Sequence, residues 1–247
     1  MKTIGLIGGM SWESTTMYYQ VINREVARRL GRLHSARFNL ISLDFEDIAS
    51  RQRAGDWDGM ARTLTGAAQR LEEGGADCVL IGTNTMHLVA PAVQRSIGVP
   101  LLHIAEVTAQ AILAQGLSKV GLLGTRFTME QPFYKERLAA RGIDCVVPDE
   151  AGRAEVHRII FEELCKGQFN PASRQVLQMI CADLAEQGVQ GVILGCTELP
   201  LILRDEDLPL PLFDTTTLHA LAAVDFALQG SAGAEASAGV MEADLAH

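Results

Sequence analysis

The sequence lacks the segments that would direct a protein to a membrane or out of the cell. No apolar run approaches the length that a membrane-spanning helix requires. The opening residues, Met1–Gly9, are too short and too rich in glycine for a signal peptide. We therefore expect a cytoplasmic protein with no membrane partner.

Positive charge is also scarce. The formal net charge is -9 at pH 7, and proteins that bind nucleic acids or anionic membranes carry a clustered basic face that this sequence does not have. The composition therefore predicts no nucleic-acid partner and favours small molecules as ligands.

Signatures of metals and cofactors are missing as well. The chain has five cysteines with no CxxC pair, which indicates reduced thiols rather than a disulfide framework or a zinc site. No HExxH pattern suggests a metal, and no lysine stands in a context typical of a pyridoxal phosphate Schiff base. The turn at Gly5–Gly9 lacks the GxGxxG spacing of a dinucleotide site. We expect neither a metal nor a cofactor.

What the sequence does contain is an alternation of short apolar runs and longer amphipathic stretches. The runs are continuously apolar, which is typical of strands that are buried on both faces; they are Thr3–Ile7, Arg37–Leu43, Cys78–Ile81, Leu101–Ile104, Val120–Leu123, Asp144–Val147, Gly191–Leu194 and Pro211–Phe213. The stretches between them have apolar residues at helical spacing, as in Thr15–Leu30, Trp57–Glu73, Glu130–Arg141, Glu155–Lys166, Ala172–Gln187 and Thr217–Leu228. This pattern predicts an α/β fold with parallel sheets covered by helices.

An internal repeat indicates two domains of similar construction. Ile4–Gly9 recurs as Val120–Thr125, and Val79–Thr85 recurs as Val192–Glu198, in the same order and at nearly the same spacing. We expect two pseudo-symmetric α/β domains, each a parallel sheet flanked by helices, with the active site in the cleft between them. Their expected bounds are 1–102 together with 205–228 for the first domain, 103–204 for the second, and 229–247 for a flexible tail.

The repeated turns are the candidate site, because ligands of open α/β sheets lie beyond the carboxyl ends of the strands. If the two halves face one another, Thr83 and Cys196 occupy equivalent positions on opposite walls of a cleft. A helix starting in Glu198–Ile202 would lower the pKa of the Cys196 thiol through its dipole and its free N–H groups, and would make this thiol a base or nucleophile. A buried structural cysteine is an equally good interpretation from position alone.

Four ordered motifs resemble one enzyme family. They are Gly5-Leu-Ile-Gly-Gly-Met-Ser-Trp-Glu-Ser-Thr15, Thr83-Asn-Thr-Met-His87, Gly124-Thr-Arg-Phe-Thr-Met129 and Gly195-Cys-Thr-Glu198. Together they resemble the aspartate/glutamate racemases, over roughly residues 1–228. The resemblance implies a homodimer of two-domain chains that inverts amino acids without a cofactor. It favours aspartate or glutamate as substrate, and a broader range of amino acids is also compatible.

Racemisation at Cα requires two acid/base groups on opposite faces of a planar intermediate. In most members of the family both groups are cysteines, whereas here Thr83 stands at the first position. A hydroxyl is a far weaker acid than a thiol. The resemblance therefore implies that Cys196 is the stronger acid/base and that Thr83 is the opposed group, which donates or relays a proton.

The resemblance also implies roles for neighbouring residues. Asn84, Thr85 and Thr197 look like the cradle for the substrate α-carboxylate, with helix capping as the alternative for the first two. Glu198 would orient the substrate ammonium or tune the thiol of Cys196.

Residues farther along the chain would face the substrate side chain. Met10 and Gln52 look like substrate-facing residues of the subgroup. Lys166 stands where aspartate-specific relatives place a lysine for the distal carboxylate, although a solvated lysine near a helix end explains it equally well. Arg51 and Arg53 are rival partners for that carboxylate.

Two other functions compete with racemisation. A decarboxylase of the same superfamily also uses a single cysteine, which protonates a planar intermediate from one face. A non-catalytic amino-acid binder would retain the turns and have lost turnover together with the first cysteine. Exchange of the α-proton in deuterated water separates both of them from a racemase.

Overall fold

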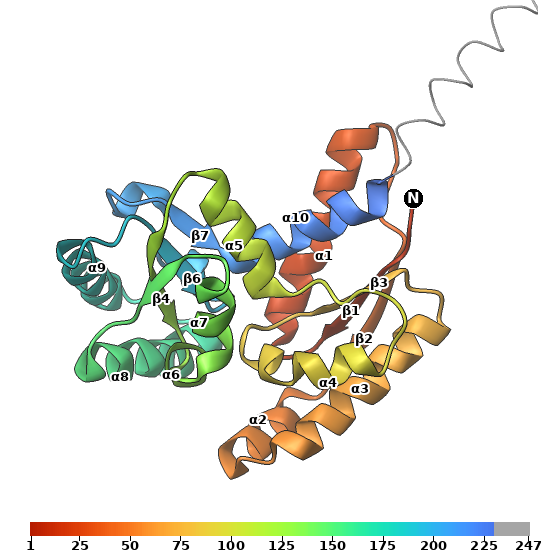
Figure 1. Cartoon of the computed structure of the whole chain (residues 1–247), viewed down its shortest axis with the longest axis horizontal. Coiled ribbons are helices and arrows are strands. Elements are labelled where there is room, and N and C mark those ends of the chain that lie inside the picture. Colours follow the sequence, from red (N-terminus) through yellow and green to blue (C-terminus); the bar gives the residue numbers. More distant parts are fainter. Residues whose placement is uncertain (230–247) are drawn as a thin grey trace, which may run out of the picture.

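Two parallel β-sheets lie side by side, one in each half of the chain (Figure 1). The first sheet has the order β2-β1-β3 and the second the order β5-β4-β6-β7. The strands are β1 (Ile4–Gly8), β2 (Phe38–Ser42), β3 (Cys78–Ile81), β4 (Lys119–Gly124), β5 (Asp144–Val146), β6 (Val192–Gly195) and β7 (Leu212–Asp214). This computed structural model describes residues 1–229, so the predicted flexible tail lies, apart from Gln229, outside the described residues.

Helices cover both sheets, as the sequence predicts. In the first half they are α1 (Trp12–Leu30), α2 (Phe45–Ala54), α3 (Trp57–Glu73) and α4 (Ala90–Arg95). In the second half they are α5 (Ile104–Ala114), α6 (Arg126–Glu130), α7 (Pro132–Ala139), α8 (Glu150–Arg158) and α9 (Pro171–Glu186), and α10 (Thr215–Leu228) follows β7. The predicted α/β fold with two helix-flanked parallel sheets is confirmed. In residues 1–229 no helix has both the length and the apolarity to cross a bilayer.

The central strands of each sheet carry the repeated turns to one edge. β1 and β3 pair in parallel, with Ile7 opposite Ile81, and β4 and β6 pair with Gly124 opposite Gly195. Since parallel strands end at the same edge of their sheet, the turns that follow them lie next to one another. The register therefore brings distant parts of the sequence together at two strand ends.

Helix α3 packs its apolar face against the first sheet. α3 begins at the cap residue Asp56, whose side chain accepts a hydrogen bond from the Gly59 N–H at 2.8 Å. Its buried face includes Leu64, which belongs to the core cluster under β1 and β3. Truncation of such a fully buried leucine to alanine costs about 2–5 kcal/mol of stability.

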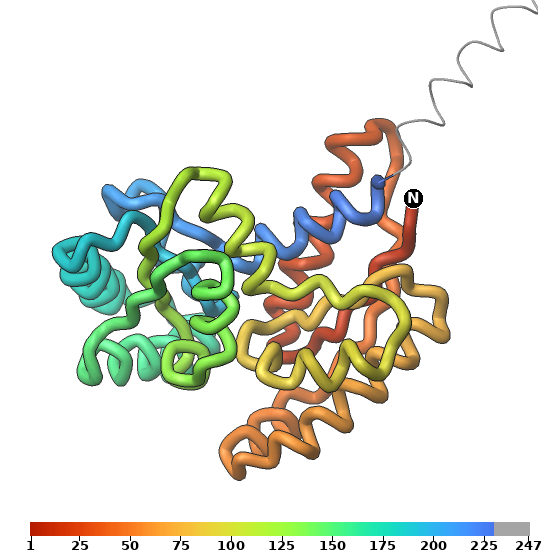
Figure 2. The backbone as a smooth tube through the Cα atoms, in the orientation of Figure 1, coloured from red at the N-terminus to blue at the C-terminus, as the bar shows by residue number. Residues whose placement is uncertain are grey.

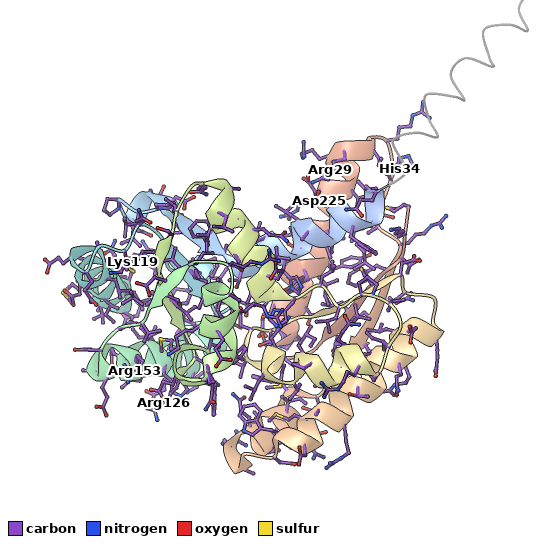
Figure 3. All side chains as sticks on the ribbon, in the orientation of Figure 1. Arg29, His34, Lys119, Arg126, Arg153 and Asp225 are labelled. Atoms are coloured by element: carbon purple, nitrogen blue, oxygen red, sulfur yellow. The ribbon has the colours of Figure 1, made fainter. Side chains whose placement is uncertain are left out.

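α10 returns from the second half to the first. Figure 2 shows the end of the described chain leaving the second half and lying along α1. Ala220 and Val224 of α10 join Tyr18 of α1 in one buried cluster. At the far end Arg29 Nη1 and Asp225 Oδ1 form an ion pair at 2.5 Å, and Figure 3 labels both residues. The two halves are thus joined by two chain crossings.

Three sequence-based boundaries differ from the structure. The expected first domain includes residues 205–214, yet β7 pairs with β6 and lies in the second sheet. The predicted strand 101–104 consists of a single bridge between Val79 and Leu101, because His103 caps the start of α5. The predicted helix 155–166 begins earlier, as α8, and ends in a π-helical turn (Ile159–Glu163) and a 3-10 turn (Leu164–Lys166). Apolar spacing alone does not distinguish these geometries.

Candidate active site

A small cavity of about 40 Å³ lies between the two halves, at the carboxyl ends of the central strands. Its polar lining comes from four strand-end turns: Met10 and Ser11 after β1, Thr83 to Thr85 after β3, Thr125 after β4, and Gly195 to Glu198 at the end of β6.

Thr83 and Cys196 line this cavity from opposite halves of the chain. Cys196 is 8% exposed, and Thr83 is partly exposed. The backbone at Thr83 is held from both sides: its N–H donates to the Ile81 carbonyl at 2.8 Å, and its carbonyl accepts from His87 Nδ1 at 2.8 Å. The arrangement places a hydroxyl and a thiol at the same cavity from two sheets.

Glu198 collects hydrogen bonds from both halves. Its Oε2 accepts from Cys196 Sγ at 3.0 Å and from Thr197 Oγ1 at 2.6 Å. Its Oε1 accepts from Ser11 Oγ at 3.1 Å, and Ser14 Oγ donates to Thr197 Oγ1 at 2.6 Å. Because Ser11 and Ser14 belong to the start of α1, this network connects the two halves at the cavity.

The acidity of Cys196 differs from the sequence-based prediction. Burial raises the pKa of the Cys196 thiol well above its usual range, and the neighbouring negative charge and hydrogen bond of Glu198 raise it further. The predicted helix after Cys196 is only the short 3-10 turn Leu199–Leu201, so there is no helix dipole to favour the thiolate. The prediction of a lowered pKa is therefore wrong, and the resting form is a thiol that donates to Glu198.

Asn84 presents an acceptor at the cavity. Its side chain is 2% exposed, and its Nδ2 donates to Thr215 Oγ1 at 3.0 Å. Thr215 Oγ1 itself donates to the Leu194 carbonyl at 2.8 Å, so it can only accept from Asn84, which determines the orientation of the amide. Within residues 1–229, Asn84 Oδ1 has no hydrogen-bond partner. A buried acceptor of this kind is suited to a ligand N–H group.

The chain also matches a known family over nearly its whole length. The sequence model of the Asp/Glu/Hydantoin racemase family matches residues 7–223, which contain all four turns around the cavity. The chain belongs to this family.

Other racemases share its fold. A crystal structure assigned as an Asp/Glu racemase of Yersinia pestis is 50% identical, with a TM-score of 0.88 over 92% of this chain and 100% of that one. An aspartate racemase homologue from Pyrococcus horikoshii is 36% identical, with a TM-score of 0.80 over 92% and 99% of the two chains. The broad specificity amino-acid racemase RacX of Bacillus subtilis is 24% identical over 90% of this chain and 96% of its own. Amino-acid racemisation is the activity these relationships support.

Most of the residues that the racemase motifs single out meet at the cavity. Its lining includes Thr83, Cys196, Met10, Gln52, Asn84, Thr85, Thr197 and Glu198. Lys166 does not line it and is exposed at the end of the 3-10 turn. Arg51 pairs with Asp56 and Arg53 with Glu46, and neither arginine lines the cavity.

Several lining residues escaped the sequence analysis. Phe45 and Ile48 come from α2, and Ile160, Phe161 and Cys165 come from the π-helical turn and the residues after it. No racemase motif contains them. Their apolar character is compatible with an ordinary core position, so nothing in their local pattern distinguishes them from core residues.

A second group of buried residues lies behind Thr83. His87 Nε2 accepts from the Ile104 N–H at 3.2 Å, so the proton on His87 Nδ1 points at the Thr83 carbonyl. The His87 ring stacks 4.6 Å from His103 and lies 5.7 Å from His219. Burial lowers the pKa of all three imidazoles, to about 3 for His103 and about 4 for His219. The cluster is neutral and ties the Thr83 turn to the start of the second half.

Proposed function

We propose that this chain racemises free amino acids at Cα without a cofactor, with Cys196 and Thr83 as the acid/base pair. The observation that carries the proposal is that a thiol and a hydroxyl from opposite halves line one cavity. Membership of the Asp/Glu/Hydantoin racemase family supports it. Inversion requires proton removal on one face of Cα and proton return on the other, and two opposed walls meet this requirement.

Because the Cys196 thiol is protonated at rest, it can act at once as an acid, and it must lose its proton before it can act as a base. In one direction the C–H bond breaks on the Thr83 side: the Thr83 hydroxyl takes the α-proton while its own proton passes to a relayed water. The Cys196 thiol donates its proton to the other face of Cα, and the thiolate that remains regains a proton from water. In the other direction the thiol proton first passes to Glu198, which lies 3.0 Å from Sγ. The thiolate then removes the α-proton, so the C–H bond breaks and the S–H bond re-forms. Thr83 gives its hydroxyl proton to the other face and regains one from water, and Glu198 releases its proton to water.

The backbone turns hold the substrate during these steps. The backbone N–H groups at Thr85 and Thr197 are suited to the α-carboxylate and to the enolate charge that develops on it. Asn84 Oδ1, which has no partner in the described residues, is suited to the ammonium. Enantiomers have equal free energies in solution, so kcat/KM must be the same in both directions.

Hydrogen exchange tests the proposal. The purified chain is incubated with single L- or D-amino acids in deuterated water, and α-deuterium and the opposite enantiomer are measured by mass spectrometry and chiral chromatography. We expect both to appear with the unaltered chain and to disappear with Cys196→Ala, because no other group replaces the thiol. Activity that survives this change would overturn the assignment of Cys196.

The same assay separates the competing functions. A decarboxylase would release CO₂ from a malonate and leave amino acids unexchanged. A non-catalytic binder would bind amino acids without exchange, even at high protein concentration.

We also propose that the enzyme is a cytoplasmic homodimer. Its first helix exposes two large aromatic side chains seven residues apart, Trp12 at 68% and Tyr19 at 52%, and this spacing places them on one helix face. Such exposure is typical of interaction surfaces. Light scattering should give twice the chain mass, and Trp12→Glu combined with Tyr19→Glu should give the mass of a monomer. A monomer before the substitutions would overturn the proposal.

A further inference from the structure

The cavity has an apolar wall opposite its polar turns. Phe45 and Ile48 of α2 belong to the first half, and Ile160 and Phe161 of the π-helical turn belong to the second. Both halves therefore present apolar side chains to the same space. The α-carboxylate and ammonium of a substrate require the polar turns, which leaves this wall for the side chain.

The charge in the cavity is negative. Among the described residues that line it, Glu198 is the only Asp, Glu, Lys, Arg or His, and in residues 1–229 no cationic side chain forms an ion pair with it. The effect reaches a second thiol: burial raises the pKa of Cys165 to about 12, and the charges of Glu198 and Glu13 contribute to the increase. A second negative group on a ligand would be repelled by Glu198, and no cation among the described lining residues would offset this repulsion.

The cations that stand near lining residues in the sequence do not themselves line the cavity. Lys166, which follows the lining residue Cys165, is exposed. Arg51 and Arg53, on the helix that carries Ile48, pair with Asp56 and Glu46. Arg126, which follows the lining residue Thr125, is exposed, and Figure 3 labels it at the lower edge of the second half. Gln52 does line the cavity, but its amide is neutral and cannot offset a charge.

We propose that the side-chain subsite accepts uncharged, apolar side chains and discriminates against aspartate and glutamate. This inference rests on the proposed function, because it assigns the side chain to the same site. Leucine and aspartate have nearly the same shape, so charge is the main difference between them. A carboxylate desolvated against Phe45, Ile48 and Phe161 without a cation would lose its hydration with nothing in return.

Binding and exchange measured side by side test the inference. Isothermal titration of L-leucine, L-methionine, L-aspartate and L-glutamate into Cys196→Ser measures affinity without turnover, and deuterium exchange by the unaltered chain measures kcat/KM. We expect leucine to exceed aspartate by at least about tenfold in both.

Two variants test whether the preference for leucine over aspartate arises at the apolar wall. Ile48→Lys places a cation at the apolar wall and should raise the affinity for aspartate relative to leucine. Lys166→Ala should change the affinities for aspartate and leucine alike.

The relative binding and exchange of aspartate and leucine decide whether the side-chain assignment and the proposed racemisation hold. Tighter binding or faster exchange of aspartate than of leucine would overturn the inference, as would a loss confined to aspartate in Lys166→Ala. Leucine that binds in preference to aspartate while no amino acid exchanges would overturn racemisation and leave the side-chain assignment intact. A chain that neither binds nor exchanges any of the four would overturn both.

Discussion

Cys196 Sγ lies 3.0 Å from Oε2 of Glu198 and donates its proton to that carboxyl group. Both side chains are buried, and Glu198 also accepts hydrogen bonds from Thr197 and from Ser11 of the other half. The thiol of this racemase therefore rests in its protonated form beside its own proton acceptor. This relationship links the acidity of Cys196 to the hydrogen-bonded contact between the two halves.

Substitution of that acceptor tests its role. Glu198→Gln keeps the size of the side chain and removes its charge, so the pKa of the Cys196 thiol should fall toward its ordinary value. Alkylation of Cys196 at a given pH, followed by peptide mass spectrometry, should become faster. The kcat should nevertheless fall, by about 10²-fold or more, because the proton acceptor is lost.

A Cys165→Ser background is the control for this experiment, since Cys165 also lines the cavity. Unchanged alkylation rates together with unchanged kcat would show that Glu198 does not act on the thiol.

Substitution at position 83 tests the opposite wall. Thr83→Cys retains the proton-bearing atom and supplies a stronger acid, so racemisation should be maintained or increased. Thr83→Val keeps the shape and removes the hydroxyl, and kcat should fall by about 10²-fold or more. Exchange and inversion are measured separately, because loss of the second face blocks inversion even where Cys196 still exchanges one enantiomer. Normal inversion by Thr83→Val would contradict the assignment of Thr83.

The buried histidines predict a specific loss of stability in acid. Burial lowers the pKa of His103 to about 3 and of His219 to about 4, while unfolded histidine titrates at about 6.5. The unfolded chain therefore binds more protons below about pH 6.5, and each of these histidines lowers the unfolding free energy by roughly 1.4 kcal/mol per pH unit down to its folded pKa. Urea unfolding at about pH 7 and about pH 5 measures the decrease.

A pair of variants isolates this effect from the carboxylates. His103→Asn keeps an N-cap acceptor for α5 and removes the titrating group, so the decrease between the two pH values should be smaller. His34→Asn alters an exposed histidine, labelled in Figure 3, and should leave the decrease unchanged. Equal decreases in both variants would rule out the buried histidines as its source.

The turn after β1 depends on a glycine. Gly9 has φ +87°, and a Cβ there would lie 2.1 Å from the Leu43 carbonyl oxygen. Gly9→Ala should therefore destabilise the chain by at least about 2 kcal/mol, through backbone strain and the clash. Gly55→Ala is the matched control, because Gly55 has φ +69° in the left-handed helical region with nothing within 4 Å of its Cβ position, and it should cost about 1 kcal/mol. Similar unfolding free energies for the two variants would contradict the clash.

The fold class and the place of the site follow from local patterns in the sequence. Continuous apolar runs indicate parallel strands buried on both faces, and the repeat of their glycine-containing turns indicates two similar halves. Because parallel strands end at one edge, the pattern alone places Thr83 and Cys196 at equivalent strand ends. The family motifs contain most of the residues that line the cavity.

Only the tertiary structure decided how the site behaves. The pKa of Cys196 depends on its burial and on Glu198, and local sequence carries no measure of burial. The apolar wall of Phe45, Ile48 and Phe161 is assembled from two helical segments that no motif connects. Lys166 lies outside the cavity, in a 3-10 turn that apolar spacing does not predict. Burial of Cys196 and assembly of the apolar wall arise from contacts between residues far apart in the chain, which periodicity and spacing do not record.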